Sequence, residues 1–258
     1  MSGKTVHIET LGSGTDLVLL HGWAMHGGIW SGIRDQLAQQ FRLHILDLPG
    51  HGLSSACDPG DFDHVVNIIQ ETLPAKYIVC GWSLGGQVAM ELALRDSKRV
   101  KGLALVSTTP CFVKQYDWPC GMESKFLQYF MENLHQNYRT TINRFLTLQI
   151  SGEQNMSIAL AQLRQFFFER DQPDHNALHK GLLILQTNDM REKLPRIEQP
   201  VLLLHGENDM ITHRSAAQWM HAQLKHSSLV MFPRCGHAPF LTDPEKFVSS
   251  LNESFFFE

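Results

Sequence analysis

Short apolar runs alternate with amphipathic segments along most of the chain. Each run is four to eight residues long, is rich in Leu, Ile or Val, and is bounded by Gly, Pro or Asp. Runs that are apolar on both faces are typical of strands in a parallel sheet that is covered on both sides. The predicted strands span 17–20, 43–48, 77–82, 100–107, 201–206 and 228–232.

The segments between these strands carry apolar residues at helical spacing. Strands that alternate with helices favour an α/β fold, with a mostly parallel central sheet and helices on both of its faces. The predicted helices span 30–40, 61–72, 84–95, 214–224 and 243–253.

The segment 111–190 interrupts this alternation, because it contains no convincing strand. Gly152 and Pro173 mark turns between stretches with apolar residues at helical spacing. These stretches contain Phe126, Phe130, Met131 and Leu134; Ile142, Phe145 and Leu146; Leu160, Leu163, Phe166 and Phe167; and Leu178, Leu182 and Leu185. We expect three or four inserted helices.

Two interpretations of this insert are open: extra packing, or a lid over a site. We favour the lid, because pockets often form between domains and the strand ends on either side carry reactive residues. The predicted organisation is a first core part, a helical lid and a second core part, at 1–110, 111–190 and 191–258.

Charge and hydropathy argue against several classes of function. A net charge of −4 over 258 residues gives no global attraction to nucleic acid or to an anionic membrane. No apolar run approaches the length of a membrane span, and the first residues lack the apolar core of a signal peptide. The five cysteines are odd in number and contain no C-x-x-C pair, which favours reduced thiols. We expect a cytoplasmic monomer that binds neither nucleic acid nor membrane.

Histidines offer no convincing metal site. His175 and His179 are four residues apart on a predicted helix, and His221 and His226 form a weaker pair. A structural or catalytic metal site needs at least three protein ligands, and no third ligand lies near either pair. We therefore expect no metal and no cofactor.

The strongest chemical signal is Gly81-Trp82-Ser83-Leu84-Gly85, between a predicted strand and a predicted helix. A serine hydroxyl is a poor nucleophile unless a base takes its proton. The G-x-S-x-G pattern holds such a serine on a tight strand-to-helix turn, and small flanking residues allow the close approach. This context predicts that Ser83 is a nucleophile, with a serine in an ordinary packing turn as the alternative.

A base and an orienting acid are expected further along the chain. His237 follows the predicted strand 228–232, and Asp209 follows the strand 201–206. Glu207 and Asp243 are the alternatives for the acid, although Asp243 resembles an N-cap of the last helix. The order Ser83, Asp209, His237 is the triad order of α/β-hydrolases.

A tetrahedral intermediate also needs hydrogen-bond donors for its oxyanion. We expect them to be the backbone N–H groups of Leu84, after the nucleophile, and Trp23, after the first predicted strand. His21 is expected to shape that turn, and Asp47 to shape the loop Asp47-Leu-Pro-Gly-His-Gly52.

Several motifs carry a family resemblance over nearly the whole chain. HGW, DLPGHGLS, GWSLGG, HGENDMIT and GHAPF resemble those of the α/β-hydrolase superfamily. LVLLHGW with its downstream IW, the tract TTPCF…DWP and above all RFLTLQISG resemble the pimeloyl-[acyl-carrier protein] methyl ester esterases of biotin synthesis. Many esterases share the elbow, whereas the last two tracts are much more specific to this family.

The resemblance implies an α/β-hydrolase fold and a concrete reaction. The family removes a methyl group from a pimeloyl chain that acyl carrier protein holds as a thioester. The resemblance assigns the triad to Ser83, Asp209 and His237. Substrate contact falls, by the same resemblance, on Trp23, Ser83, Leu84, Phe145, Leu146, Thr147, Leu148, Gln149 and His237.

The resemblance also implies that lid arginines receive the acidic carrier protein. Arg144 matches a family position, and Arg139 and Arg164 are further candidates in a basic lid segment that also contains Arg170. Other positions depart from the pattern. Thr140, Ser157 and Ala161 stand where further basic residues are expected.

Two other classes of function remain open. One is a different serine hydrolase on the same scaffold, such as a short-chain carboxylesterase or a carbon–carbon bond hydrolase. The other is a non-catalytic ligand receptor. Dehalogenases and epoxide hydrolases are disfavoured, because they need an aspartate in place of Ser83. The terminal run 255–257 is expected to pack as a tail.

Overall fold

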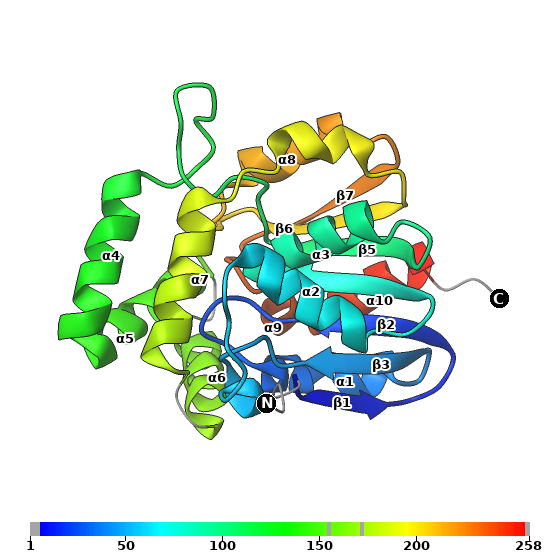
Figure 1. Ribbon diagram of the computed structural model, residues 1–258, viewed down its shortest axis with the longest axis horizontal. Helices are drawn as coiled ribbons and strands as arrows, with labels where there is room; N and C mark the ends of the chain where they lie inside the picture. Colours follow the sequence, from blue (N-terminus) through cyan, green and yellow to red (C-terminus); the bar gives the residue numbers. More distant parts are fainter. Residues whose placement is uncertain (1–5, 154–155, 171–172, 256–258) are drawn as a thin grey trace.

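A seven-stranded sheet forms the centre of the molecule (Figure 1). The computed structural model describes residues 6–153, 156–170 and 173–255. The strands lie in the order β1-β3-β2-β4-β5-β6-β7, and all neighbours pair in parallel except β1 with β3. Their bounds are β1 Ile8–Leu11, β2 Thr15–Leu20, β3 Phe41–Leu46, β4 Tyr77–Trp82, β5 Val100–Val106, β6 Val201–Gly206 and β7 Ser227–Phe232.

All six predicted strands are therefore confirmed, and β1 is an addition. Strands β4 and β6 are buried at every residue, as the continuous apolar runs predicted. Strand β1 has only four residues, and none of them is fully buried. A short edge strand of this kind lacks the apolar run by which the other six were found.

Helices cover both faces of the sheet (Figure 1). Helices α2, α3 and α8 pack on one face, and α1, α9 and α10 pack on the other. The predicted segment 30–40 is a 3₁₀ turn, η1, followed by the shorter helix α1. The bounds are η1 Gly27–Trp30, α1 Ser31–Leu37, η2 Gly52–Ser54, α2 Phe62–Thr72, α3 Leu84–Arg95, η3 Arg191–Arg196, α8 Arg214–Gln223, α9 Pro239–Thr242 and α10 Pro244–Phe255.

In its described residues, the insert between β5 and β6 contains four α-helices, which stand to one side of the sheet in Figure 1. These helices are α4 Ser124–Gln136, α5 Tyr138–Gln149, α6 Met156–Glu169 and α7 His175–Thr187. Helix α5 packs on α4 and α6, and α4 also packs on α7. Because the insert begins after the carboxyl end of β5, it lies at the edge of the sheet where ligand sites of open α/β folds form.

Several polar contacts tie the insert to the sheet domain, and three of them involve α6, α7 and the residue after α6. The Arg170 guanidinium donates to Asp47 at 2.6 Å, and His26 Nε2 donates to the Phe166 carbonyl at 2.6 Å. The indole N–H of Trp23 donates to the Leu178 carbonyl at 2.9 Å. Because these contacts come from α6, α7 and the turn after α6, they hold one side of the insert against the strand-end loops.

The chain end packs on the sheet through Phe255. This ring is buried, and a Cβ added at Gly102 of β5 would lie 2.6 Å from it. The rest of the predicted packing tail, residues 256–257, lies outside the described residues. Among the helices that the structure describes, none is long and apolar enough to cross a membrane.

Candidate active site

Ser83 occupies a strained turn between β4 and α3. Its φ of 54° lies in the left-handed region, which residues with a side chain rarely adopt. The neighbouring glycines make this turn possible. A Cβ at Gly81 would lie 2.2 Å from the Gly85 carbonyl oxygen, and a Cβ at Gly85 would lie 2.5 Å from the Leu20 carbonyl oxygen. The pattern G-x-S-x-G is therefore a steric requirement of the turn.

Asp209 and His237 form a buried hydrogen-bonded pair. His237 Nδ1 donates to Asp209 Oδ2 at 2.7 Å, and both side chains are almost inaccessible to solvent. Asp209 follows β6, and His237 follows β7, the adjacent strand of the sheet. Parallel strands end at the same edge, which is why residues 28 positions apart meet.

The Asp209 carboxyl is held ionised by its surroundings. Burial alone would raise its pKa, but His237 and several hydrogen bonds outweigh burial, so the pKa lies below its usual range. Asp209 Oδ1 accepts from the backbone N–H groups of Ile211 and Thr212, at 2.8 and 2.9 Å. The Thr212 hydroxyl donates to Oδ2 at 2.8 Å. An ionised acceptor leaves the proton of His237 on Nδ1 and Nε2 free to act as a base.

Trp82 links the histidine to the serine. Its indole N–H donates to the His237 carbonyl at 2.8 Å, and the two rings lie 5.6 Å apart between centroids. Trp82 directly precedes Ser83, so this bond places the histidine loop beside the elbow. The hydrogen bonds between described residues include none from the Ser83 hydroxyl, which faces a cavity instead.

The two predicted oxyanion donors border the same position. Leu84 is the first residue of α3, where a backbone N–H has no acceptor within the helix. The turn before Trp23 lies directly against the serine, since a Cβ at Gly22 would be 3.2 Å from the Cβ of Ser83. Within the described part of the chain, neither the backbone N–H of Leu84 nor the backbone N–H of Trp23 is paired with a protein acceptor.

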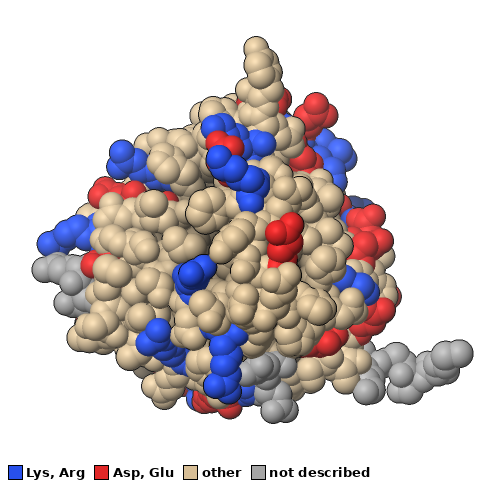
Figure 2. All heavy atoms as spheres, turned by 90° about the vertical axis from the view of Figure 1, so that its left-hand side faces the viewer, with Lys and Arg blue, Asp and Glu red and all other residues tan. Residues whose placement is uncertain are grey.

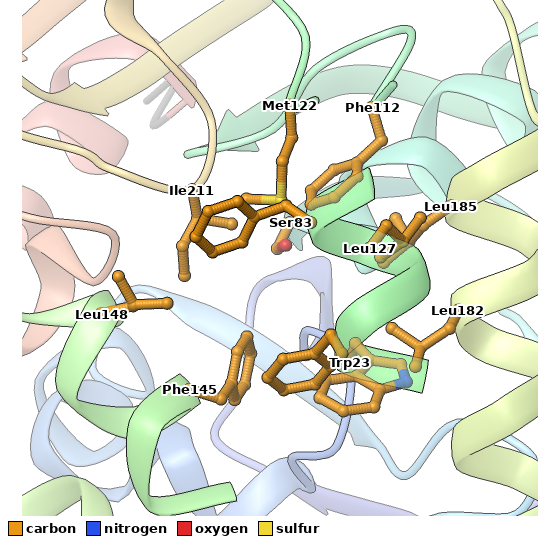
Figure 3. A pocket seen from close by; sticks show the side chains of 12 residues that line it. Trp23, Ser83, Phe112, Met122, Leu127, Phe145, Leu148, Leu182, Leu185 and Ile211 are labelled. Atoms are coloured by element: carbon orange, nitrogen blue, oxygen red, sulfur yellow. The ribbon is translucent and has the colours of Figure 1, made fainter. Parts of the chain in front are cut away.

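An apolar cavity covers Ser83 (Figure 3). Apart from this serine, every residue that lines it is hydrophobic. In Figure 3, Met122 lies above Ser83 and Ile211 lies to its left, and Trp23 and Phe145 lie below it. The full lining is Trp23, Ser83, Phe112, Met122, Phe126, Leu127, Phe130, Phe145, Leu148, Leu182, Leu185 and Ile211.

The predicted contact run of the lid divides into residues that reach the cavity and residues that do not. Phe145 and Leu148 line it, and the Phe145 ring stands edge-on to Trp23 with 4.9 Å between centroids. Leu146 is fully buried in the hydrophobic core and lines no described pocket. Helical geometry explains this, because adjacent residues of a helix point about 100° apart.

Thr147 and Gln149 also lie away from the cavity lining. Thr147 borders a separate surface groove, and its hydroxyl donates to the Asn143 carbonyl at 2.8 Å. The Gln149 side chain is buried, and its amide has no partner among the described residues. Its backbone carbonyl accepts from the His237 N–H at 2.6 Å, so Gln149 touches the histidine loop rather than the cavity.

An outer groove between α4 and α5 adjoins the cavity. Phe126, Phe130 and Leu148 line both spaces. The remaining residues of the groove include Lys125 and Arg144, which put two positive charges at its rim. We call this space the outer groove; it is lined by Lys125, Phe126, Tyr129, Phe130, Thr140, Asn143, Arg144, Thr147 and Leu148.

The predicted lid arginines differ in their surroundings. Arg144 lies 3.5 Å from the Tyr129 hydroxyl, Arg164 donates to Asn143 at 3.1 Å, and Arg139 is exposed on α5. Arg170 is different, because its guanidinium is already paired with Asp47. Figure 2 shows the lid side, where basic side chains are scattered over the face and acidic ones gather toward its right-hand edge.

His21 and Asp47 form part of the loop framework, as expected. His21 Nδ1 donates to the Gly22 carbonyl, and its Nε2 accepts from the Leu48 N–H. Burial lowers the pKa of His21 to about 3, so the ring is neutral. Asp47 accepts from the backbone N–H groups of Gly27 and Leu53 as well as from Arg170.

The alternative acids and the histidine pairs lie elsewhere. Asp243 accepts from the Lys246 N–H at 3.1 Å, which makes it a cap of α10, and Glu207 makes no side-chain bond to a described residue. His175 and His179 are exposed. Across the described residues, no group of three His, Cys, Asp or Glu side chains could hold a metal ion.

Sequence reasoning missed part of the cavity wall and the Asp47–Arg170 pair. Phe112, Met122 and Ile211 lie in loops, where no periodicity marks them. Phe126, Phe130, Leu182 and Leu185 did carry a signal, since each was assigned to an apolar stripe of a lid helix. A stripe shows that a face is buried, but it does not distinguish a packed face from one that lines a cavity.

Comparisons with known proteins agree with this geometry. A model of the alpha/beta hydrolase fold family matches residues 16–244. A pimeloyl-[acyl-carrier protein] methyl ester esterase of Nitrosomonas europaea is 54% identical over 95% of this chain and 97% of its own. The esterase of the same name from Nitrosospira multiformis is 49% identical over 97% and 98%.

Solved structures support the fold alone. An esterase from Exiguobacterium antarcticum superposes with a TM-score of 0.84 at 24% identity, over 96% of this chain and 94% of its own. The serine elbow, the histidine–carboxylate pair and the two full-length relatives thus lead to one assignment. The chain belongs to the α/β-hydrolase fold family and, within it, to the pimeloyl-[acyl-carrier protein] methyl ester esterases.

Proposed function

We propose that the protein is a serine esterase that hydrolyses the methyl ester of pimeloyl-[acyl-carrier protein] to pimeloyl-[acyl-carrier protein] and methanol, in biotin synthesis. The observation that carries this proposal is an apolar cavity with one polar group, the Ser83 hydroxyl, in a chain 54% identical to a relative of that name. The cavity explains the choice of an ester. A neutral methyl ester enters apolar surroundings at little cost, whereas a free carboxylate would lose its hydration.

The triad has the following roles in this proposal. His237 takes the proton of Ser83 through Nε2, and the serine oxygen attacks the ester carbonyl. Asp209 holds the histidine tautomer and stays ionised, which its lowered pKa supports. The N–H groups of Trp23 and Leu84 stabilise the oxyanion, a contribution of about 3 kcal/mol for each such donor.

Methanol then leaves with the proton that His237 holds. Water attacks the acyl-enzyme, again with His237 as the base, and the Ser83–acyl bond breaks to release the carboxylate. Every proton passes through the one imidazole, so the reaction needs neither a metal nor an organic cofactor.

The lid supplies substrate contact and carrier docking. Phe145, Leu148 and Trp23 pack against the acyl chain, because their side chains form the cavity wall. Arg144, together with Arg139 on the same helix and Arg164 on α6, attracts the acidic carrier protein; the place of Arg144 in the outer groove supports this role. Electrostatic attraction of this kind acts mainly on the rate of association.

The proposal also includes a cytoplasmic, monomeric enzyme whose lid is residues 111–190. All five cysteines are free thiols in the structure, which supports a reducing compartment. Light scattering of the purified protein measures the oligomeric state, and a dimer would contradict this part of the proposal.

The deciding experiment is demethylation of pimeloyl-carrier methyl ester by the purified protein, followed by mass spectrometry of the carrier. Rescue of a biotin auxotroph that lacks its own esterase is the matched test in cells. We expect both to succeed. Good activity on simple esters without demethylation of the carrier substrate would identify a generic carboxylesterase instead.

A further inference from the structure

The proposed reaction creates a transport problem. Its leaving group is methanol, so the large part of the substrate, acyl chain and carrier, stays covalently bound to Ser83 after the first step. We take the outer groove as the route by which the acyl chain reaches Ser83, because it adjoins the cavity at Phe126, Phe130 and Leu148 and has Arg144, the proposed carrier-docking residue, in its lining. The tethered carrier therefore blocks the mouth while methanol is still inside and water has yet to enter.

A second pocket adjoins the cavity. It shares Met122 and Ile211 with the cavity, but it has no lining residue in common with the outer groove. We call it the side pocket; it is lined by Pro119, Cys120, Gly121, Met122, Asp209, Met210, Ile211, His213 and Ser215. It opens to solvent, since Met210 is 63% exposed and His213 is also exposed.

The side pocket differs from the cavity in chemistry. Asp209, His213 and Ser215 are polar members of its lining, whereas Ser83 is the one polar residue in the lining of the cavity. Small polar molecules such as water and methanol fit a lining with hydrogen-bonding groups. The acyl chain, by contrast, fits the apolar cavity. The two spaces therefore suit the two parts of the ester.

Met122 and Ile211 line both spaces and form the wall between them, and their side chains differ in conformational freedom. The Ile211 N–H donates to Asp209 Oδ1 at 2.8 Å, and its β-branched side chain is buried. The Met122 backbone is also held, by bonds to the Phe112 carbonyl and the Lys114 N–H at 2.8 Å each. Its side chain is long and unbranched, and Figure 3 shows it above Ser83. Met122 is thus the movable part of the wall.

We propose that the side pocket is a passage through which methanol leaves and water enters, with the Met122 side chain as its gate. This inference rests on the proposed function, because only a carrier-bound substrate keeps the mouth blocked. In the first step the Ser83 oxygen–acyl bond forms and the acyl–methoxy bond breaks. In the second step the water oxygen–acyl bond forms and the Ser83 oxygen–acyl bond breaks. One methanol leaves and one water enters in each cycle.

A native thiol allows the passage to be closed. Cys120 lines the side pocket and is half-buried, whereas the other four cysteines are buried. Alkylation of Cys120 with a bulky maleimide, counted as one adduct by mass spectrometry, fills the pocket without touching the cavity. The Cys120→Ser variant, treated in the same way, is the matched control. Ser215→Trp closes the pocket by mutation in a second, independent way.

Two substrates distinguish the passage from general damage. The carrier-bound methyl ester blocks the mouth, whereas methyl butyrate leaves it open, so its products can leave by either route. We expect closure to lower kcat about tenfold for the carrier-bound ester and less than about twofold for methyl butyrate. Treated Cys120→Ser should keep both activities.

Three results would contradict the proposal. If full alkylation or Ser215→Trp leaves kcat for the carrier-bound ester unchanged, neither methanol nor water passes through the side pocket. An equal loss on both substrates would show damage to the catalytic groups instead. If the untreated enzyme does not demethylate the carrier-bound ester, the proposed function itself is wrong, and the passage is overturned with it.

Discussion

The strand-end site and the lid of this protein are built in different ways. Ser83, Asp209 and His237 sit on turns after β4, β6 and β7, and each is held by backbone hydrogen bonds or by a strained backbone. The lid contributes side chains from helices that contact one another mainly through apolar faces. Rigid strand ends position the reacting atoms, whereas the lid forms the shape into which a substrate fits.

This difference separates the residues that carry out the reaction from the residues that select the substrate. The loops of the strand-end site carry buried hydrogen bonds in which a change of one atom is costly. The lid surface carries Arg144 and Lys125 at the outer groove, where both side chains are exposed to solvent. Changes at the strand ends should therefore abolish turnover of every ester, and changes in the lid should alter which ester is turned over.

Replacement of the nucleophile should have the largest effect. Ser83→Ala removes the attacking oxygen, and we expect hydrolysis of a short p-nitrophenyl ester to fall about 10⁶-fold. Thermal unfolding of the variant should match the parent, since alanine meets the same backbone strain as serine. Undiminished activity would disprove the mechanism.

Replacement of the orienting acid should come next. Asp209→Asn keeps the size of the side chain but favours the wrong tautomer of His237, and we expect kcat to fall about 10⁴-fold. Asp243→Asn is the matched control, because Asp243 caps α10 and asparagine caps equally well. Similar kcat values for the two variants would contradict the assignment of Asp209.

Reversal of the Arg144 charge in the lid should affect the carrier-bound ester but not short esters. Arg144→Glu reverses a charge at the outer groove, and we expect KM for the carrier-bound ester to rise about tenfold and association to lose part of its salt dependence. Hydrolysis of short esters should not change. Lys98→Glu, between α3 and β5, is the control for net charge. Equal slowing of short esters would make Arg144 a packing residue.

The smallest effect concerns stability at low pH. Burial lowers the pKa of His21 to about 3 in the folded state, so only the unfolded chain binds this proton between about pH 6.5 and 3. Stability should therefore be complete above pH 6.5 and fall as the pH is lowered from there. Calorimetry at about pH 7 and about pH 5 measures the difference.

His21→Gln is the variant that tests this origin. It should be less stable than the parent at neutral pH, but its melting temperature should depend less on pH over the same interval. His51 and His205, whose pKa values burial also lowers, keep part of the dependence in both proteins. An unchanged pH dependence in the variant would show that His21 is not responsible.

The sequence by itself determined the parts of this protein that depend on neighbours in the chain. Six buried strands followed from short apolar runs, and the elbow followed from two glycines without which the turn at Ser83 would clash. The order of the reactive residues after successive strands was enough to bring Asp209 and His237 together, because parallel strands end at one edge.

Only the tertiary structure decided what depends on distant segments. It turned Leu146 into the lid core and Phe145 toward Trp23, and it paired Arg170 with Asp47, 123 residues apart. It also brought Met122 and Ile211, from two distant loops, to the lining of one cavity. Helical spacing fixes which residues share a face, but the packing of helices against the sheet decides what that face meets.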